Sequence, residues 1–90
     1  MEFEWDPKKA ISNERKHAIT FEFATGVFED SGRTERPDES SAAEERWATV
    51  GVVEGVEIYV VYTVRNEAIR LITARRATRN EREEYWNRQI

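Results

Sequence analysis

Apolar and polar residues follow two different periods along this chain, and the changes of period predict its elements. Residues 3–5 alternate with a period of two, which predicts a short strand. Two helices are predicted over residues 7–17 and 21–28. Asp6-Pro7 and Thr20 provide their starts, and apolar residues recur at helical spacing in the second. The N-terminal third of the chain is therefore expected to form a strand and two connected helices.

The segment over residues 29–45 is rich in Ser, Gly and Pro and holds seven acidic residues. No hydrophobic period runs through it, and such a composition is typical of a surface connection. A connection of this length is longer than usual, which indicates a functional or poorly ordered segment. We therefore expect one acidic, mobile loop from residue 29 to residue 45.

Three strands are predicted next, over residues 47–54, 58–64 and 68–77, because these segments are rich in Val, Ile, Tyr and Thr. Gly55-Val56 and Asn66-Glu67 fit short hairpin turns. The run from Thr78 to Glu81 has the form of a capping box, so a final helix is expected to begin at Arg79. Together the elements predict a single α+β domain over residues 1–90, with two N-terminal helices on a small, mainly antiparallel sheet and a C-terminal helix.

If both turns have two residues, the side chains of the three strands divide between the two faces of the sheet as follows. The face expected to pack on the N-terminal helices collects Trp47, Thr49, Val53, Ile58, Val60, Tyr62, Val64, Ile69 and Leu71. The other face has an apolar centre fringed with arginine and collects Arg46, Ala48, Val50, Tyr59, Val61, Thr63, Arg65, Arg70, Ile72, Ala74 and Arg76. A single bulge would exchange the sides of Arg75 and Arg76, so the pattern leaves their faces open.

Charge is distributed unevenly along the chain. The formal net charge of −4 argues against a simple nucleic-acid binder, but residues 46–90 hold 8 arginines and 6 acidic residues. No apolar run is long enough to span a membrane, no signal-peptide pattern is present, and there is no cysteine. These features predict a soluble cytoplasmic protein whose basic residues are gathered locally.

The residue inventory excludes several kinds of active site. One histidine and no cysteine argue against a metal centre or a nucleophile triad, and no glycine-rich phosphate loop is present. No cofactor is therefore expected. What remains is Lys16-His17 at a helix end and the arginines of the last strand, a set that suits metal-free RNA cleavage. Arginine can stabilise charge on the phosphate, and Lys16 or His17 can move a proton.

Each of these residues also has a purely structural interpretation. Lys16 and His17 are placed where cations stabilise a helix C-terminus, and from sequence alone that interpretation is the more favoured. The arginines from residue 70 to residue 82 can form a solvated face, and the aromatic residues of the strands are typical core residues. Arg75 fits this interpretation least well, because a strand end among small residues is a costly place for an idle charge.

The order and spacing of several short motifs resemble those of BrnT-like toxins over nearly the whole chain. In the N-terminal half the resemblance is carried by Phe3-Glu4-Trp5-Asp6-Pro7, Lys9-Ala10, Asn13, Lys16-His17, Phe21-Glu22 and Ala24. Later it is carried by Glu45-Arg46-Trp47, Gly51, Val61-Tyr62-Thr63, Arg65, the run from Arg70 to Arg75, Ala77, Glu81-Arg82 and Tyr85. The chain departs from the pattern at Ala18, where the family usually has glycine. Alanine disfavours the left-handed helix end that glycine adopts easily.

The resemblance implies a small RelE-like ribonuclease toxin of a type II toxin–antitoxin pair. Such a toxin would cut RNA without metal, inhibit translation, and be neutralised by a ribbon-helix-helix antitoxin through which the complex would bind operator DNA. The residues that it implies for catalysis are Lys16, His17, Arg75 and Arg79. Arg46 and Arg65 are implied for the same surface as substrate-binding residues, and Arg70 and Arg76 of the arginine-rich strand are placed with them.

A second hypothesis is a non-catalytic module that binds a ribbon-helix-helix partner and contributes to control of its operon. It is motivated by the acidic net charge, whereas the resembling toxins are often basic, and by an apolar stripe on the last helix. The stripe, expected to contact a partner, consists of Tyr85, Trp86 and Ile90. A small-molecule enzyme is the least favoured class, because so small a core leaves little room for a deep pocket.

Overall fold

The computed structural model describes residues 1–90 and has an α+β fold built on one five-stranded sheet in the order β1-β5-β4-β3-β2. Only β1 and β5 are parallel, and the other neighbours are antiparallel. The strands are β1 (Glu2–Glu4), β2 (Thr34–Asp38), β3 (Arg46–Val53), β4 (Val56–Arg65) and β5 (Ala68–Arg76). The helices are α1 (Pro7–His17), α2 (Phe21–Ala24), the 3-10 helix η1 (Thr25–Glu29) and α3 (Arg79–Asn87).

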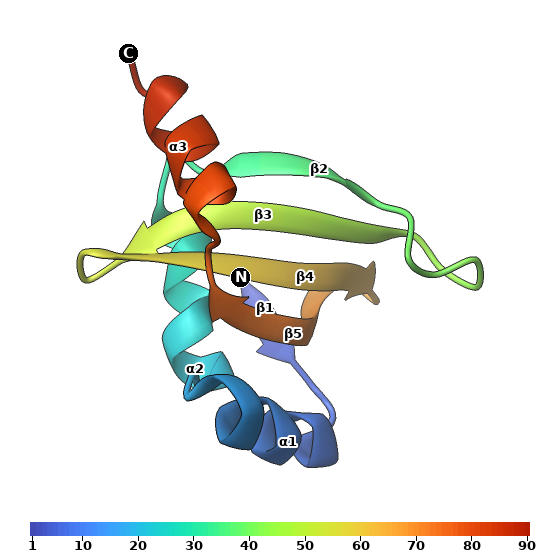
Figure 1. Cartoon of the computed structure of the whole chain (residues 1–90). Helices are drawn as coiled ribbons and strands as arrows, with labels where there is room; N and C mark the ends of the chain where they lie inside the picture. Colours follow the sequence, from blue (N-terminus) through green and yellow to red (C-terminus); the bar gives the residue numbers. More distant parts are fainter.

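The sheet separates two unequal hydrophobic clusters. The larger one packs α2 and η1 on one face of the sheet, with Phe21, Val27, Ile58, Val60 and Leu71 almost fully buried. The smaller one lies under α3 on the other face. Figure 1 shows α3 at the top and left of the view and α1 at the bottom, while the connection between β2 and β3 projects at the right, away from α3. One face is thus covered by the N-terminal helices, and α3 covers only one end of the other.

The two N-terminal helices begin where the sequence predicts. Asp6 Oδ1 accepts a hydrogen bond from the Lys8 N–H at 2.9 Å, and Thr20 Oγ1 accepts one from the Phe23 N–H at 3.0 Å. The second helix differs from the expectation, because it is an α-helix only to Ala24 and continues as η1. Its glycine lies against β3: a Cβ on Gly26 would stand 2.8 Å from Val53. None of the helices is long and apolar enough to cross a membrane.

The expectation of one loop over residues 29–45 is wrong for its centre. Residues 34–38 form β2, an edge strand paired with β3 from Thr34↔Val50 to Asp38↔Arg46. Its sequence Thr-Glu-Arg-Pro-Asp hides the strand, because charge and proline are typical of a loop. They are equally typical of an exposed edge strand, where they prevent pairing with other chains. The connection that remains runs over residues 39–45.

Both hairpins were expected, and the turns are close to the predicted positions. The β4–β5 turn is at Asn66-Glu67 as predicted, with φ of 49° and 66°. The β3–β4 turn is at Glu54-Gly55, one residue earlier than predicted, with φ of 49° and 82°. Positive φ at both central residues is the requirement of a tight hairpin turn whose twist matches the strands.

A β-bulge in β5 decides which face each arginine of this strand takes. The β4–β5 register shifts between Val61↔Thr73 and Tyr62↔Leu71, so that Ile72 is the extra residue. Beyond the bulge Ala74 lies in the large core, although the simple alternation assigned it to the opposite face. Arg75 pairs with Tyr59 on the α3 side, and Arg76 pairs with Ile58 on the other side. The bulge thus places Arg75 beside the start of α3.

Candidate functional site

Four of the candidate arginines share one face of the sheet, the face that α3 covers in part. Arg46 directly precedes Trp47, and Arg65 lies three residues beyond Tyr62. Trp47 and Tyr62 both pack in the large core, so strand alternation turns the two arginines to the opposite face. Arg70 and Arg75 join them through their pairs with Thr63 and Tyr59. Arg75 lies at the α3 end of this face, and the other three lie near the opposite end.

Arg75 is the most firmly positioned of the candidates. Its guanidinium carbon lies 3.9 Å from the centre of the Tyr59 ring, a cation–π arrangement. Nη1 and Nη2 donate to the two carboxylate oxygens of Glu81 at 2.8 and 3.0 Å, and Nη1 also donates to the Arg76 carbonyl at 3.1 Å. These bonds use three of the five N–H groups of the side chain. The two that remain, on Nε and Nη2, point from one edge of the guanidinium and form a pair suited to a phosphate.

Glu81 connects Arg75 to the start of α3. Thr78 and Glu81 form the capping box that the sequence predicts, with Glu81 Oε1 accepting the Thr78 N–H at 2.8 Å. Although burial acts to raise the pKa of Glu81, hydrogen bonds from Arg75 and from the Thr78 N–H outweigh it and lower that pKa below its usual value. The hydrogen bond to Glu81 in turn raises the pKa of Arg75. Both groups are therefore charged at neutral pH.

The lowered pKa of Glu81 predicts an acid-dependent loss of stability. The folded protein gains from the ionised carboxylate at pH values above the ordinary value of 4.5, and this gain is lost as the pH falls through the lower folded pKa. Glu81→Gln is expected to be less stable than the wild type at neutral pH but to lose less of its stability on acidification. Denaturant unfolding at a series of pH values measures the free energy of unfolding of both proteins. The same dependence of this free energy on pH in the two proteins would contradict the prediction.

Asn13 fixes α1 against the part of β5 that β1 does not cover. Its buried side chain accepts the Ala74 N–H at 3.0 Å and donates to the Ala74 and Ile19 carbonyls at 2.8 and 3.0 Å. The amide group thus takes the place of a neighbouring strand along the free edge of β5. One turn further along α1, Lys16 and His17 line a shallow hollow with Ile72 and Thr73. The end of α1 is therefore held next to β5, two residues before Arg75.

The helix end at Ala18 is left-handed, despite the expectation that alanine disfavours it. Ala18 has φ 57° and ψ 30°, and its N–H donates to the Glu14 carbonyl at 2.8 Å. This conformation brings the chain from Lys16-His17 directly into the link before α2, and a residue with a Cβ pays a steric cost for it.

Ala18→Gly is expected to raise the free energy of unfolding by about 1 kcal/mol, because glycine adopts this conformation without the steric cost. Ala10→Gly, inside the same helix, is the matched control and is expected to lower it by about 1 kcal/mol. Denaturant unfolding of the two variants checks the signs. Destabilisation by both substitutions would show that Ala18 is not strained.

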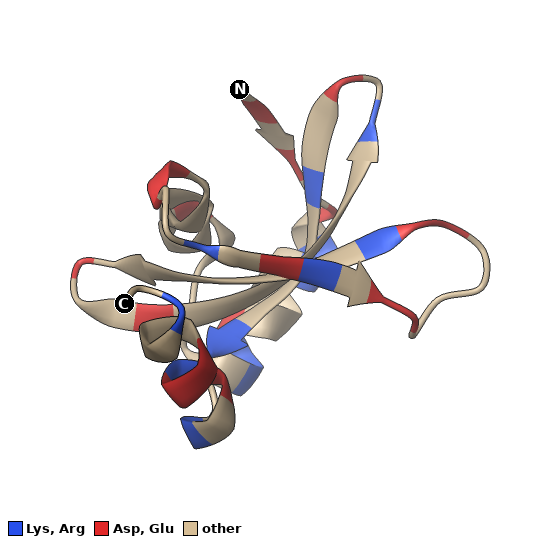
Figure 2. Cartoon of the chain, turned by 90° about the horizontal axis from the view of Figure 1, so that it is seen from above, with Lys and Arg blue, Asp and Glu red and all other residues tan.

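The remaining arginines are mostly paired with carboxylates. Glu44, in the connection before β3, accepts from Arg46 Nε at 3.3 Å and from Arg65 Nη2 at 3.1 Å. Arg70 donates to Glu4 at 2.8 Å, and the exposed Arg79 to Glu83 at 3.1 Å. Figure 2 shows basic and acidic segments interspersed over the strands and helices. Arg46 and Arg65 thus pair with the connection before β3, whereas Arg70, Arg75 and Arg79 pair with carboxylates elsewhere in the chain.

The candidates therefore occupy three places. Arg75 and Arg79 flank the start of α3, with Arg76 exposed on the other face at the same strand end. Lys16 and His17 lie at the adjacent free edge of β5. The third group, at the opposite end of the sheet, consists of Arg46, Arg65 and Arg70. No group of three or more His, Cys, Asp or Glu side chains is arranged to hold a metal ion.

The expected partner stripe on α3 is corrected at Tyr85. This side chain is buried against Val50 and Ala77, and its hydroxyl donates to Asp30 Oδ2 at 2.5 Å, so it fixes α3 to the sheet. Asp30 also accepts the Gly32 and Val52 N–H groups at 2.9 and 2.8 Å. Trp86 is 50% exposed and Ile90 fully exposed, so only these two remain available to a partner.

Three residues have roles at the site that the sequence did not reveal: Asn13, Tyr59 and Glu81. The predicted face of Tyr59 is confirmed, but its contact with Arg75 depends on the bulge. The sequence predicts Glu81 as the N3 residue of a capping box and as part of the motif Glu81-Arg82, and neither links it to Arg75. A carboxylate there is close to the last residues of the preceding strand, which is a signal that could have linked it to Arg75.

Comparison with known protein families identifies a match over most of the chain. A family model described as "Ribonuclease toxin, BrnT, of type II toxin-antitoxin system" matches residues 5–81. The matched range includes all the candidate basic residues, whereas Tyr85, Trp86 and Ile90 lie beyond it. No curated protein matches the chain.

Proposed function

The chain belongs to the BrnT family of ribonuclease toxins of type II toxin–antitoxin systems, and on this premise we propose that it cleaves RNA without a metal ion at the free edge of β5. The observation that carries the proposal is the arrangement of Arg75. Its guanidinium is held by Tyr59 and Glu81 yet keeps two N–H donors on one edge. A preorganised pair of donors in a fixed position is what stabilises charge that develops on a phosphate.

In the proposed reaction the 2′-hydroxyl of the substrate attacks the adjacent phosphorus. Of Lys16 and His17, one takes the proton of this hydroxyl and the other gives a proton to the departing 5′-oxygen. Arg75 binds the nonbridging oxygens as their charge increases. One P–O bond forms and one breaks, which leaves a 2′,3′-cyclic phosphate and a 5′-hydroxyl. We propose that Arg79, at the start of α3, exchanges its ion pair with Glu83 for a contact with the same phosphate.

Incubation of the purified protein with RNA in the presence of EDTA tests this proposal. Cleavage that persists in EDTA, leaves cyclic phosphate ends and stops when the 2′-hydroxyl at the cut site is methylated supports it. A requirement for an added divalent ion would contradict the metal-free mechanism, and the absence of cleavage under any condition would contradict the nuclease function itself.

A second candidate is a module with weak catalysis that acts by binding its antitoxin. The ion pairs favour it, because Arg46, Arg65, Arg70, Arg75 and Arg79 each contact a carboxylate of the chain. Induction of the protein in growing cells separates the two candidates. A nuclease that inhibits translation arrests growth, whereas a pure binding module leaves growth unchanged.

For the cognate antitoxin we propose a ribbon-helix-helix protein that contacts the outer side of α3 and brings the complex to operator DNA. Trp86, although exposed, is held in place by a hydrogen bond from its indole N–H to Glu57 at 2.8 Å, and Ile90 extends beyond the helix. A fixed, half-exposed tryptophan is typical of residues that dominate an interface.

Trp86→Ser is expected to weaken antitoxin binding by about 10- to 30-fold, in the range typical of interface tryptophans, while RNA cleavage stays near the wild-type rate. Titration calorimetry with the antitoxin and a cleavage assay measure the two properties. Arg88→Ala, on the same helix, is the control. Unchanged antitoxin affinity in Trp86→Ser would exclude this side of α3 as the interface.

A further inference from the structure

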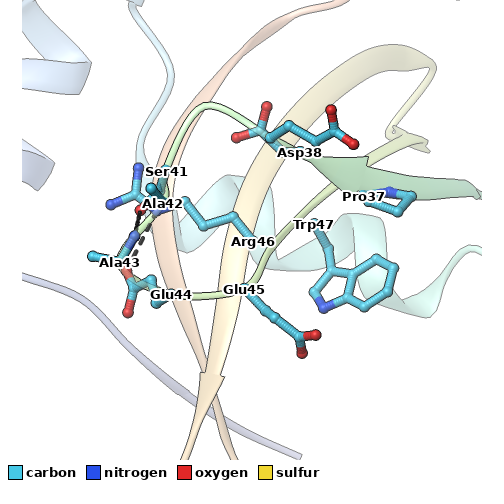
Figure 3. A pocket seen from close by; sticks show the side chains of 10 residues that line it. Pro37, Asp38, Ser41, Ala42, Ala43, Glu44, Glu45, Arg46 and Trp47 are labelled. Carbon is cyan, nitrogen blue, oxygen red and sulfur yellow. Dashed lines mark hydrogen bonds and ion pairs between the residues drawn. The ribbon is translucent and has the colours of Figure 1, made fainter.

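Glu44 links two arginines from neighbouring strands. Its Oε2 accepts from Arg65 Nη2 at 3.1 Å and its Oε1 from Arg46 Nε at 3.3 Å. Figure 3 shows the Arg46 side chain reaching from β3 across the connection to Glu44, while the neighbouring Glu45 points away. The two oxygens of one anion are thus shared between two guanidinium groups. This is also how two arginines bind the nonbridging oxygens of a phosphate diester.

The position of this pair on the sheet fits the path of an RNA strand. Arg46 and Arg65 lie on the same face as Arg75 but at the other end, where no helix covers the sheet (Figure 1). Arg65 is six residues beyond Tyr59 along β4, or about 20 Å at the usual rise of a strand. A single RNA strand held by Arg75 at the cut site would therefore reach Arg46 and Arg65 with a phosphate several nucleotides away.

The residue that occupies this position belongs to a connection rather than to a strand. Glu44 belongs to the connection 39–45, which is in neither β2 nor β3. Hydrogen bonds from Arg65 and Arg46 lower the pKa of Glu44, so the carboxylate is charged at neutral pH. The side chains of Glu44, Arg46 and Arg65 are 25%, 23% and 51% exposed. Partly solvated ion pairs of this kind are weak, so a phosphate with the same charge can replace the carboxylate.

We propose that Arg46 and Arg65 form a second phosphate subsite for RNA, several nucleotides from the cut site, and that Glu44 fills this subsite as an internal competitor until RNA displaces it. The inference rests on the proposed ribonuclease function and adds a substrate contact and a built-in inhibitor to it. It follows that removal of the Glu44 charge strengthens binding only of RNA long enough to span both positions.

Binding of 2′-O-methyl oligoribonucleotides, which cannot be cleaved, tests the inference. Glu44→Gln keeps the shape of the side chain and removes its charge, and Glu45→Gln removes the same charge from the same connection without an arginine contact. Fluorescence anisotropy compares an oligomer that spans the face with a trimer. We expect Glu44→Gln to bind the long oligomer roughly three- to tenfold more tightly than the wild type. The affinity of Glu45→Gln for this oligomer is expected to differ from that of the wild type by less than about twofold.

Addition of Arg46→Ala to Glu44→Gln is expected to abolish the gain. An equal gain in Glu44→Gln and Glu45→Gln, an equal gain for the trimer, or a gain that survives Arg46→Ala would overturn the inference. The outcome is independent of catalysis, since the probe is not cleaved. Wild-type protein that cuts RNA in EDTA but shows no specific effect of Glu44 would refute the subsite alone, and protein that cuts nothing would refute the ribonuclease proposal.

Discussion

Arg75→Ala is expected to reduce RNA cleavage by roughly 100- to 1,000-fold, the loss that follows removal of a preorganised donor to a developing oxyanion. The side chain is only 30% exposed, yet three of its N–H groups serve to fix it and two remain for a phosphate. The variant is expected to stay folded, because Arg75 lies outside the large core. Cleavage rates at saturating substrate, with thermal unfolding of the same sample, measure both effects.

Two further variants show whether cleavage needs the planar guanidinium of Arg75 or only a positive charge on this part of the protein. Arg75→Lys keeps the charge but lacks the planar fork, so it is expected to recover little of the lost activity. Arg88→Ala removes an exposed arginine of α3 paired with Glu84, and is expected to cleave at the wild-type rate. Full activity in Arg75→Ala would exclude this guanidinium from the reaction. Full activity in Arg75→Lys would show that charge alone is sufficient there.

Asn13→Ala is expected to lower the free energy of unfolding by about 3 kcal/mol, because it leaves buried backbone groups without a partner. The groups are the N–H and carbonyl of Ala74 and the carbonyl of Ile19, which Asn13 satisfies at 2.8 to 3.0 Å. Cleavage is expected to fall as well, since Asn13 holds the end of α1 that carries Lys16 and His17. Denaturant unfolding and the cleavage assay measure the two losses.

Ile11→Ala is the matched control for Asn13→Ala. Ile11 lies on the same helix and is 55% exposed, so its truncation is expected to change stability by less than about 0.5 kcal/mol. A stability loss in Asn13→Ala that is no larger than in Ile11→Ala would show that the edge of β5 does not depend on this amide. If Asn13→Ala is destabilised but cleaves RNA at the wild-type rate, the end of α1 takes no part in cleavage.

Local signals were sufficient for most of the fold. The caps at Asp6, Thr20 and Thr78 fix three helix starts through bonds within a few residues, and these bonds are present in the structure. The period of two across β3 and β4 predicted which side chains enter the large core, with Val60 and Tyr62 among them. The α+β arrangement follows from these elements because the amphipathic sheet has one face to bury.

The features that the sequence could not predict depend on contacts between distant segments. The bulge at Ile72 moves Ala74 into the core and turns Arg75 toward Tyr59, and it follows from the pairing of β4 with β5 rather than from the β5 sequence. The bonds from Asn13 to Ala74 join residues 61 positions apart. The polar strand β2 gains its structure only by pairing with β3. Each of these is a tertiary effect that overrides local preference.

We propose that Arg75 and the Lys16-His17 pair bind one phosphate of RNA from the two sides of the β5 end. A crystal structure with a bound 2′-O-methyl oligoribonucleotide tests it most directly. We expect a phosphate within hydrogen-bond distance of Arg75 Nε and Nη2 and of Lys16 or His17. A strand bound elsewhere, with that edge of Arg75 facing solvent, would contradict it.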